Sequence, residues 1–494
     1  MLKQRAFLAT LWSAVDVFLR QGLQLVVTVV LARLLSPEEF GTIALLSLFI
    51  GISSVLVDSG FSSALIQKQD ATHADESTVF WFNLTAGILA TIALCLAAPY
   101  IAAFYEKPVL THIIYAFSLV ITINASGAIH VALLTKRLDF LTQMKIGTLA
   151  NLVSGALAIF LAWRGLGIWS LVAQAVTSSV LSNLLLWLFN SWRPQFGFKW
   201  SSARMLIGFG GYMLAATLLD TLYSKGYSVL IGKFYSTREL GLYSQADNTK
   251  QFPTGMLSAI LSRVAFPMLS AIAEDKARLQ RGVQLCIRSM MLINIPMMLG
   301  LAVLADTMME AVFGVKWLAA APIMQILCVA AVLWPLHVIN VNVLLAQGHS
   351  RLIFNLQIVK SILGIALLVI GSRYGIIGIA WSQVALSGAG FILNTHYTKV
   401  HLDYGALKQL RDNLPAMLVC LPMIAVVHFL EIYWEATPII KLFGLTLFGI
   451  LLFVGTSYLT GLSALKDLLS LFHKGPRAQS EIHDKIKNCD ANGS

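Results

Sequence analysis

The chain has 494 residues, of which 57% are hydrophobic and only 12% are charged, and its mean hydropathy is +0.76. Soluble domains carry about 25% charged residues, so this composition excludes a soluble globular protein and indicates a protein embedded in lipid. The formal net charge of +11 fits cytoplasmic loops that retain Lys and Arg, and it requires no nucleic-acid partner.

With about 20 apolar residues for each crossing of the bilayer, the sequence predicts about fourteen membrane spans. In chain order, the expected spans are residues 10–34, 40–66, 79–103, 109–132, 146–163, 167–190, 206–231, 240–270, 283–305, 319–346, 353–372, 375–398, 413–432 and 437–461. The first is too long and too charged, with Asp16 and Arg20, for a signal peptide, so we expect it to be retained.

Part of the sequence recurs roughly 200 residues further along the chain. The segment Ser36–Gly41 returns as Ser236–Gly241, and both copies predict a capping box, in which Ser and Glu satisfy the free amides of a helix start. Three further pairs follow in the same order: Phe104-x-x-Lys107 with Phe313-x-x-Lys316, Arg137–Phe140 with Arg351–Phe354, and Gly167–Ser170 with Gly378–Ser382. A duplicated, almost wholly apolar chain is typical of membrane transporters.

The repeat also predicts the architecture. Six expected spans separate the first span from its copy, and an even number means that both copies insert in the same direction. We therefore expect an all-α polytopic membrane protein with two six-helix bundles, residues 1–200 and 201–400, related by a pseudo-twofold axis along the membrane normal. Residues 401–461 add two further spans, and residues 462–494 form a basic tail.

The distribution of positive charge predicts the orientation. Most of the 35 Lys and Arg residues fall in segments that are cytoplasmic if the N terminus is cytoplasmic. Because cytoplasmic loops retain Lys and Arg during insertion, we expect a multi-pass protein with both termini in the cytoplasm.

Motifs of enzymes and of metal sites are absent from the sequence. The five cysteines are scattered, and no pair has the spacing of a metal or redox site. There is no Walker A loop, and no loop is long enough to carry a catalytic site. We therefore expect a protein that is not an enzyme and that holds neither a metal nor another cofactor.

Three apolar segments carry a family resemblance. The runs Asp58–Gln67, Phe313–Trp317 and Gln325–Val329 resemble the polysaccharide transporter family, whose superfamily also holds the multidrug and toxin extruders. The resemblance covers about residues 1–460. It implies helices in two bundles and the transfer of undecaprenyl-pyrophosphate-linked oligosaccharides across the bacterial inner membrane, for the synthesis of exopolysaccharide, O-antigen or a similar polymer.

Charged residues inside the expected spans are candidates for a cavity or a gate, because an ionisable group in the membrane normally faces water or a partner. These candidates are Asp16, Asp220, Lys225, Asp247 and Lys250. Asp16 and Arg20 are four residues apart, so an ion pair within one helix is one interpretation. The repeat places Asp220 at the position of Arg20, so a latch between the two copies is the other.

Cations dominate the half of the membrane nearer the cytoplasm. Arg20, Arg263, Arg288 and Lys360 lie in that half, and we interpret them as a port for the pyrophosphate of a substrate, since Arg donates two hydrogen bonds to phosphate at once. For Arg263 and Arg288, the alternative is that the side chains extend from span ends into the interface.

The expected span 240–270 is the most polar, and a sugar chain offers hydroxyls and apolar ring faces that suit polar and aromatic side chains. The candidate glycan contacts are Tyr243, Gln245, Asn248, Gln251 and, in a later span, Trp334. The alternatives are an interfacial position for the first four and a helix interface for Trp334.

Three functions compete. A flippase for lipid-linked oligosaccharide that works by alternating access leads, a multidrug and toxin extrusion antiporter on the same fold is the alternative, and a membrane enzyme of polysaccharide assembly is disfavoured by the short loops. The expected partners are the lipid-linked substrate and membrane lipid. A proton or sodium coupling ion and a polysaccharide polymerase are further candidates.

Overall fold

The structure is a computed structural model that describes residues 2–58, 65, 71–197, 200–272, 275–462 and 465. Within this set, the side chains of residues 2–11, 200–213 and 259–268 and of a few other positions are not described. Most of the run Asp58–Gln67 and almost all of the predicted tail 462–494 therefore lie outside the described residues. All regular secondary structure in the described part of the chain is helical, as predicted.

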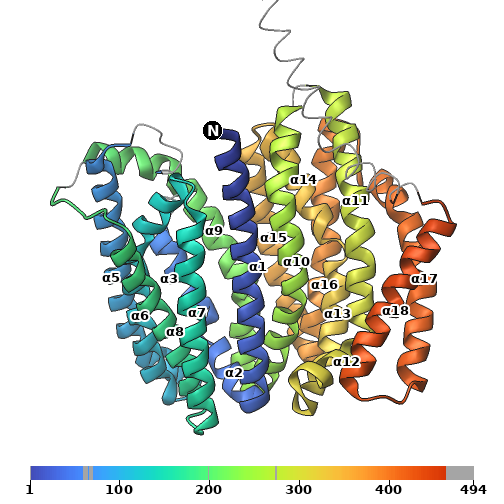
Figure 1. The fold of residues 1–494 in the computed structure, drawn as a ribbon, viewed down its shortest axis with the longest axis horizontal. Coiled ribbons are helices and arrows are strands. Elements are labelled where there is room, and N and C mark those ends of the chain that lie inside the picture. Colours follow the sequence, from blue (N-terminus) through green and yellow to red (C-terminus); the bar gives the residue numbers. More distant parts are fainter. Residues whose placement is uncertain are drawn as a thin grey trace, which may run out of the picture. The chain divides into compact units, whose positions relative to one another are not determined.

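The described part of the first copy of the repeat is almost entirely helical (Figure 1). Their bounds are α1 (Leu2–Leu34), α2 (Pro37–Ala44), α3 (Ser47–Asp58), α5 (His73–Phe104), α6 (Val109–Lys136), α7 (Phe140–Trp163) and α8 (Ile168–Phe189). Helices α2 and α3 meet at a bend of 40°, so they form one broken apolar segment.

The second copy follows the same plan with more interruptions. Its helices are α9 (Trp200–Phe234), α10 (Thr237–Ala271), α11 (Lys276–Val303), α12 (Ala305–Met308), α13 (Ala321–Ala331), α14 (Trp334–Ala346), α15 (Ser350–Gly371) and α16 (Gly375–Leu402). A π-helical turn, η1 (Met309–Phe313), and a 3₁₀ turn, η2 (Val315–Ala320), connect α12 to α13, and a 3₁₀ turn, η3 (Ser372–Tyr374), follows α15. Helices α17 (Ala406–Tyr433) and α18 (Pro438–Leu459) come last.

Long apolar helices make the chain a multi-pass membrane protein. Among the described residues, nine helical segments are long and apolar enough to cross a membrane, or ten if the bent pair α2 and α3 counts as one span. The prediction of about fourteen spans and two six-helix bundles is finer than this observation and stays a prediction.

The chain packs into two compact units that interleave the two copies of the repeat. Unit 1 holds Met1–Ala246, Val312–Ile323 and Gln357–Ser382, and unit 2 holds Asp247–Ala311, Met324–Leu356 and Gln383–Ser494. The compact units are defined by packing, whereas the copies of the repeat are defined by sequence similarity. The division into bundles at residue 200 therefore stays a prediction.

In unit 1, small and hydroxylated residues bring helices close together. A Cβ on Gly87 of α5 would lie 2.5 Å from the Cβ of Ala125 on α6, and Thr91 donates to the carbonyl oxygen of Ser118 at 2.7 Å. Small residues and interhelical hydrogen bonds hold helices together in lipid, where apolar burial offers little. Helix α1 packs against α7, and α3 packs against α9.

In unit 2, helix α17 packs on α11 and α18 through an apolar core that includes Ile287, Met291 and Cys420. Two polar clusters fix its register. Asn340 and Gln409 exchange amide hydrogen bonds of 3.0 and 2.9 Å in a fully buried position. Asp412 accepts from Arg288 at 2.8 Å and from the Tyr404 hydroxyl at 2.8 Å.

Candidate functional site

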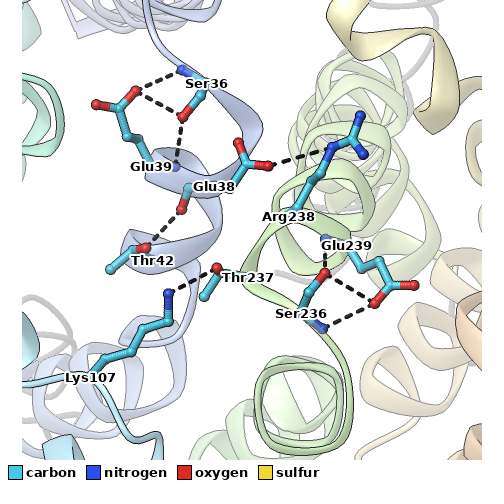
Figure 2. A network of polar contacts seen from close by, with 9 residues as sticks. All are labelled: Ser36, Glu38, Glu39, Thr42, Lys107, Ser236, Thr237, Arg238 and Glu239. Atoms are coloured by element: carbon cyan, nitrogen blue, oxygen red, sulfur yellow. Dashed lines mark hydrogen bonds and ion pairs between the residues drawn. The ribbon is translucent and has the colours of Figure 1, made fainter.

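The two predicted capping boxes form and lie side by side in unit 1 (Figure 2). At the start of α2, the backbone N–H of Ser36 donates to Glu39 Oε2 at 2.7 Å, and Ser36 Oγ accepts from the backbone N–H of Glu39. At the start of α10, Ser236 and Glu239 repeat both bonds, at 3.0 and 3.1 Å. Each box satisfies amides that the first helical turn would otherwise leave without partners. The predicted capping boxes are therefore confirmed.

Helices α2 and α10 cross at two equivalent glycines. A Cβ on Gly41 would lie 1.7 Å from the carbonyl oxygen of Thr237, and a Cβ on Gly241 would lie 1.9 Å from the carbonyl oxygen of Pro37. Gly41 and Gly241, like Pro37 and Thr237, are 200 positions apart, so the contact is reciprocal. Only glycine permits this approach of two backbones.

Polar side chains bridge the same crossing. Glu38 Oε1 and Arg238 Nε are 3.5 Å apart, and these two residues again occupy equivalent positions of the repeat. Lys107, at the turn between α5 and α6, donates to the Thr237 hydroxyl at 3.1 Å. Figure 2 shows the Glu38–Arg238 contact between the two helix starts and the bond from Lys107 to the start of α10.

Cations at the ends of α1 and α9 contact the opposite copy in a matching way. Arg33 Nε donates to the carbonyl oxygen of Val312 at 2.8 Å, and Lys233 Nζ donates to the carbonyl oxygen of Phe104 at 2.8 Å and contacts Glu106 at 3.2 Å. Arg33 and Lys233 are equivalent; Lys233 reaches the Phe-x-x-Lys segment of the other copy, and Arg33 reaches the residue directly before it. Carbonyls at helix ends lack intrahelical donors, so a cation there satisfies them.

The segment Val312–Ile323 closes the arrangement. Lys316 Nζ donates to the carbonyl oxygens of Arg33, at 2.9 Å, and of Leu35, and Trp317 Nε1 donates to that of Ala32 at 2.8 Å. Trp317 is fully buried, with its ring edge-to-face against Phe40. These bonds explain why this segment of the second copy packs within unit 1.

We call this arrangement the repeat joint, formed by residues 32–42, 104–107, 232–241 and 312–317. Sequence reasoning found its capping boxes and both Phe-x-x-Lys segments, but it did not place them in contact. The signal was available, because the similar segments are short, polar and positioned between long apolar runs. The π-turn that presents Val312 has no equally clear signature in the sequence.

The predicted charges in α1 pair with each other. Arg20 Nε lies 2.6 Å from Asp16 Oδ1, and Arg20 Nη2 donates to the carbonyl oxygen of Gln143 at 2.7 Å. A Cβ on Gly147 would lie 2.3 Å from the Arg20 guanidinium carbon, so α7 provides the space for this side chain. The structure thus shows the ion pair within one helix, while Asp220 accepts from Gln357 on α15 at 3.0 Å.

The remaining predicted charges are distributed over both units. Lys360 lies on the same helix as Gln357 and interacts electrostatically with Asp220 in unit 1, and Lys225 is half-buried on α9 in the same unit. In unit 2, Asp247 binds Lys250 at 2.7 Å and accepts from Gln251 at 2.5 Å.

Whether the four residues of the predicted pyrophosphate port lie close together stays a prediction. Arg20 and Lys360 lie in unit 1, and Arg288 lies in unit 2, paired with Asp412. The side chain of Arg263 lies outside the described part of the structure.

The predicted glycan contacts differ in exposure. Tyr243 and Gln245 are buried in unit 1, with the Tyr243 ring 4.7 Å from that of Tyr227. Asn248 and Gln251 are exposed on α10. Trp334 is 44% exposed, and its indole N–H donates to Ser258 Oγ at 2.7 Å, which fixes the orientation of the ring.

Residues 30–322 match the family described as polysaccharide biosynthesis protein, and this match spans more than half of the chain. The chain belongs to this family. The matched range contains every segment of the repeat joint, so the joint lies within the part of the sequence that identifies the polysaccharide biosynthesis protein family.

Three relatives cover most of the chain. The teichuronic acid biosynthesis protein TuaB of Bacillus subtilis is 28% identical over 77% of this chain and 80% of its own length. The lipopolysaccharide biosynthesis protein WzxC of Escherichia coli is 27% identical, over 76% and 77% of the two chains. The succinoglycan biosynthesis transport protein ExoT of Rhizobium meliloti is 25% identical, over 94% and 96%.

Solved structures of transporters share the fold. The lipid II flippase MurJ in an inward closed conformation has a TM-score of 0.76 at 15% identity, covering 91% of this chain and 98% of its own. An inward-facing multidrug resistance transporter of the MATE family has a TM-score of 0.58 at 16% identity, covering 78% and 96%. At these identities the likeness concerns the fold alone.

Proposed function

We propose that this protein is a flippase that transfers lipid-linked oligosaccharide across the bacterial inner membrane for polysaccharide synthesis. Its relatives are named for the synthesis of teichuronic acid, lipopolysaccharide and succinoglycan, and the last of them is named a transport protein. The fold it shares with a lipid II flippase supports a lipid-linked substrate.

The proposed topology has about fourteen spans. Residues 1–200 and 201–400 form two six-helix bundles, residues 401–461 add two helices, and both termini are cytoplasmic. Helix α1 runs away from the N terminus and ends at Leu34. The repeat joint, which begins at the end of α1, would then lie on the periplasmic side.

The repeat joint carries the mechanism that we propose. It joins equivalent segments of the two copies at one end of α1 and α9, through backbone contact at Gly41 and Gly241 and through cations that bind opposite helix ends. A transporter built from two related halves works by closing one side of the cavity while the other is open. The joint is the closed periplasmic gate of such a cycle, and the substrate enters from the cytoplasmic leaflet.

Many weak bonds suit a gate that has to open. Exposed ion pairs such as Glu38–Arg238 contribute about 0–1 kcal/mol each, and a typical hydrogen bond about 0.5–1.5 kcal/mol net. The summed free energy of these bonds is large enough to favour the closed joint. It is also small enough that a substrate which binds more tightly to the open state can shift the equilibrium towards opening.

The decisive experiment measures transfer of a labelled lipid-linked oligosaccharide in proteoliposomes that contain the purified full-length chain. A flippase moves the glycan between leaflets, and empty liposomes do not. Efflux of cationic drugs without glycan transfer would instead establish the multidrug extruder, whose fold this chain shares with the lower TM-score of 0.58.

The pyrophosphate port of Arg20, Arg263, Arg288 and Lys360 is part of the proposal, and Arg288 offers the sharpest test. Arg288→Gln should lose most transfer per folded protein, and Arg288→Lys should lose part of it, because the bidentate geometry is absent. Arg288→Gln also leaves Asp412 without its 2.8 Å charged partner, which costs about 1–3 kcal/mol of stability.

The double variant Arg288→Gln with Asp412→Asn separates the two roles of Arg288. It removes the ion pair as a whole, so a purely structural Arg288 would leave transfer at the wild-type rate per folded protein. A substrate contact would leave transfer as low as in Arg288→Gln. The pair Arg20→Gln with Asp16→Asn provides the same comparison in α1.

A further inference from the structure

In unit 2, the helix is interrupted between α13 and α14, and side chains of two neighbouring helices bond to the backbone there. Helix α13 ends at Ala331, and α14 begins at Trp334. Such a break leaves backbone carbonyls without their usual donors, and in a membrane these carbonyls need other partners. Ser387 on α16 donates to the carbonyl oxygen of Ala330 at 2.8 Å.

A second side chain completes the set. Asn294 on α11, fully buried, donates to the carbonyl oxygens of Ala331 at 3.1 Å and of Val332 at 2.8 Å. Three successive carbonyl oxygens at the break therefore accept hydrogen bonds from side chains of neighbouring helices. These bonds stabilise the interrupted backbone.

A histidine one turn into α14 is bonded to this arrangement. His337 Nε2 lies 3.3 Å from Ser387 Oγ, and His337 Nδ1 lies 3.2 Å from Asn394 Nδ2. Because an amide nitrogen only donates, Nδ1 is an acceptor and the ring is neutral with its hydrogen on Nε2. In this hydrogen-bond chain, Asn394 donates to His337, His337 donates to Ser387, and Ser387 donates to the carbonyl oxygen of Ala330.

Asn394 has an unused acceptor beside the ring. It is fully buried on α16, and its Oδ1 has no hydrogen-bond partner. A buried polar atom without a partner costs about 1–3 kcal/mol. Turning the amide by half a rotation would exchange Nδ2 and Oδ1, and Oδ1 would then face His337 Nδ1.

We propose that His337 is a proton-binding site through which transport is coupled to protons, and that Asn394 is the side chain that responds. A proton arriving on Nδ1 makes a second donor, which opposes the Asn394 amide N–H. The amide turns, and its Oδ1 accepts from Nδ1 in a charge-assisted bond. The proton forms a new N–H bond at Nδ1, the hydrogen bond between Asn394 and the ring reverses its direction, and no other covalent bond is made or broken.

Binding of the proton changes the stability of the break. The imidazolium is a positive charge within a membrane span, and it favours a conformation in which water or an anion reaches it. The ring also bonds Ser387, which holds Ala330, so the charge acts on the segment that joins α13 to α14. Proton binding therefore shifts the balance between transport conformations.

Two pairs of charged groups on the surrounding helices are bonded to each other. Asp247 and Lys250 on α10 bind each other, and Arg288 on α11 binds Asp412 on α17. The other titratable side chains of the central and later parts of α11, α13 and α16 are Cys286, Cys328, His396, Tyr397, Lys399 and His401.

Proteoliposomes with and without a pH gradient test the coupling, which rests on the proposed flippase function. The wild-type transfer rate should change several-fold with the gradient. His337→Gln, whose amide can still donate and accept, should transfer glycan at one rate under both conditions. His396→Gln, which changes an exposed histidine of α16, should respond like the wild type. A His337→Gln variant that keeps the full response, or a wild type without one, would overturn the proposal.

A second measurement does not depend on transport. Nitrogen NMR of labelled histidine in the full-length protein in lipid identifies the His337 signal by its loss in His337→Gln, and we expect this ring to gain a proton on Nδ1 as the pH falls. Asn394→Asp places a carboxylate acceptor at Nδ1 and should let the ring bind its proton at a higher pH than in the wild type. A ring that stays neutral throughout would overturn the proton site, whereas titration without any glycan transfer by the wild type would refute only the flippase function.

Discussion

Replacing either Gly41 or Gly241 by alanine should prevent the repeat joint from closing and should reduce glycan transfer by about 5- to 150-fold. An added Cβ would lie 1.7 Å from the carbonyl oxygen of Thr237 or 1.9 Å from that of Pro37, where ordinary contact needs at least 3.4 Å. The obstacle is backbone, so no side-chain rotation relieves it. Overpacking of this kind costs about 1–3 kcal/mol, which shifts the equilibrium between closed and open joints by that factor.

Accessibility of a single cysteine measures the state of the joint directly. Thr42 on α2 is 6% exposed, so Thr42→Cys in a background without native cysteines should react slowly with an impermeant maleimide when the joint is closed. Adding Gly241→Ala should speed the reaction. Gly255→Ala, on the same helix with nothing within 4 Å of its Cβ, is the matched control and should change neither labelling nor transfer. Slow labelling and normal transfer in both joint variants would contradict the gate.

The sequence predicted helix starts more securely than it predicted contacts between helices. A capping box depends on residues three apart, such as Ser36 and Glu39, so it can be recognised locally. The approach of Gly41 to Gly241 depends on how two distant segments pack, and glycine is frequent in membrane helices whether or not two backbones cross there. The repeat supplied the equivalence of the two glycines, but the structure was needed to show that equivalent residues touch.

Charges inside spans were harder to interpret than helix ends. Arg20 had two candidate partners, Asp16 one turn away and Asp220 in the other copy, and the structure shows it with Asp16 and with the carbonyl of Gln143. An ion pair within one helix forms whenever the helix forms. An ion pair between two helices also requires that both side chains lie at the same depth in the membrane and on facing sides of their helices. The roles of Arg263, Arg288 and Lys360 with the substrate stay predictions for the same reason.

The break at α13 and α14 shows which signals the sequence did contain. Pro335 lacks a backbone N–H, and prolines in membrane helices are tolerated where neighbouring side chains satisfy the freed groups. That Asn294 and Ser387 would supply the donors could not be predicted, because they lie on other helices. Trp334 was predicted as a candidate glycan contact, but its bond to Ser258 was not predicted.

Linking residues 38 and 238 across the repeat joint should stop transfer and should do so reversibly. Glu38 and Arg238 belong to helices α2 and α10, their charged atoms are 3.5 Å apart, and both side chains are about half exposed, so reagents can reach them. Because an exposed ion pair contributes at most about 1 kcal/mol, Glu38→Cys with Arg238→Cys should fold and transfer glycan almost normally before linking. A bifunctional methanethiosulfonate should then hold the joint closed and abolish most transfer, and a reductant should restore it. Each single cysteine variant treated with the same reagent controls for modification alone. If the linked protein transfers glycan at the wild-type rate, the joint does not open during transport and cannot be the gate.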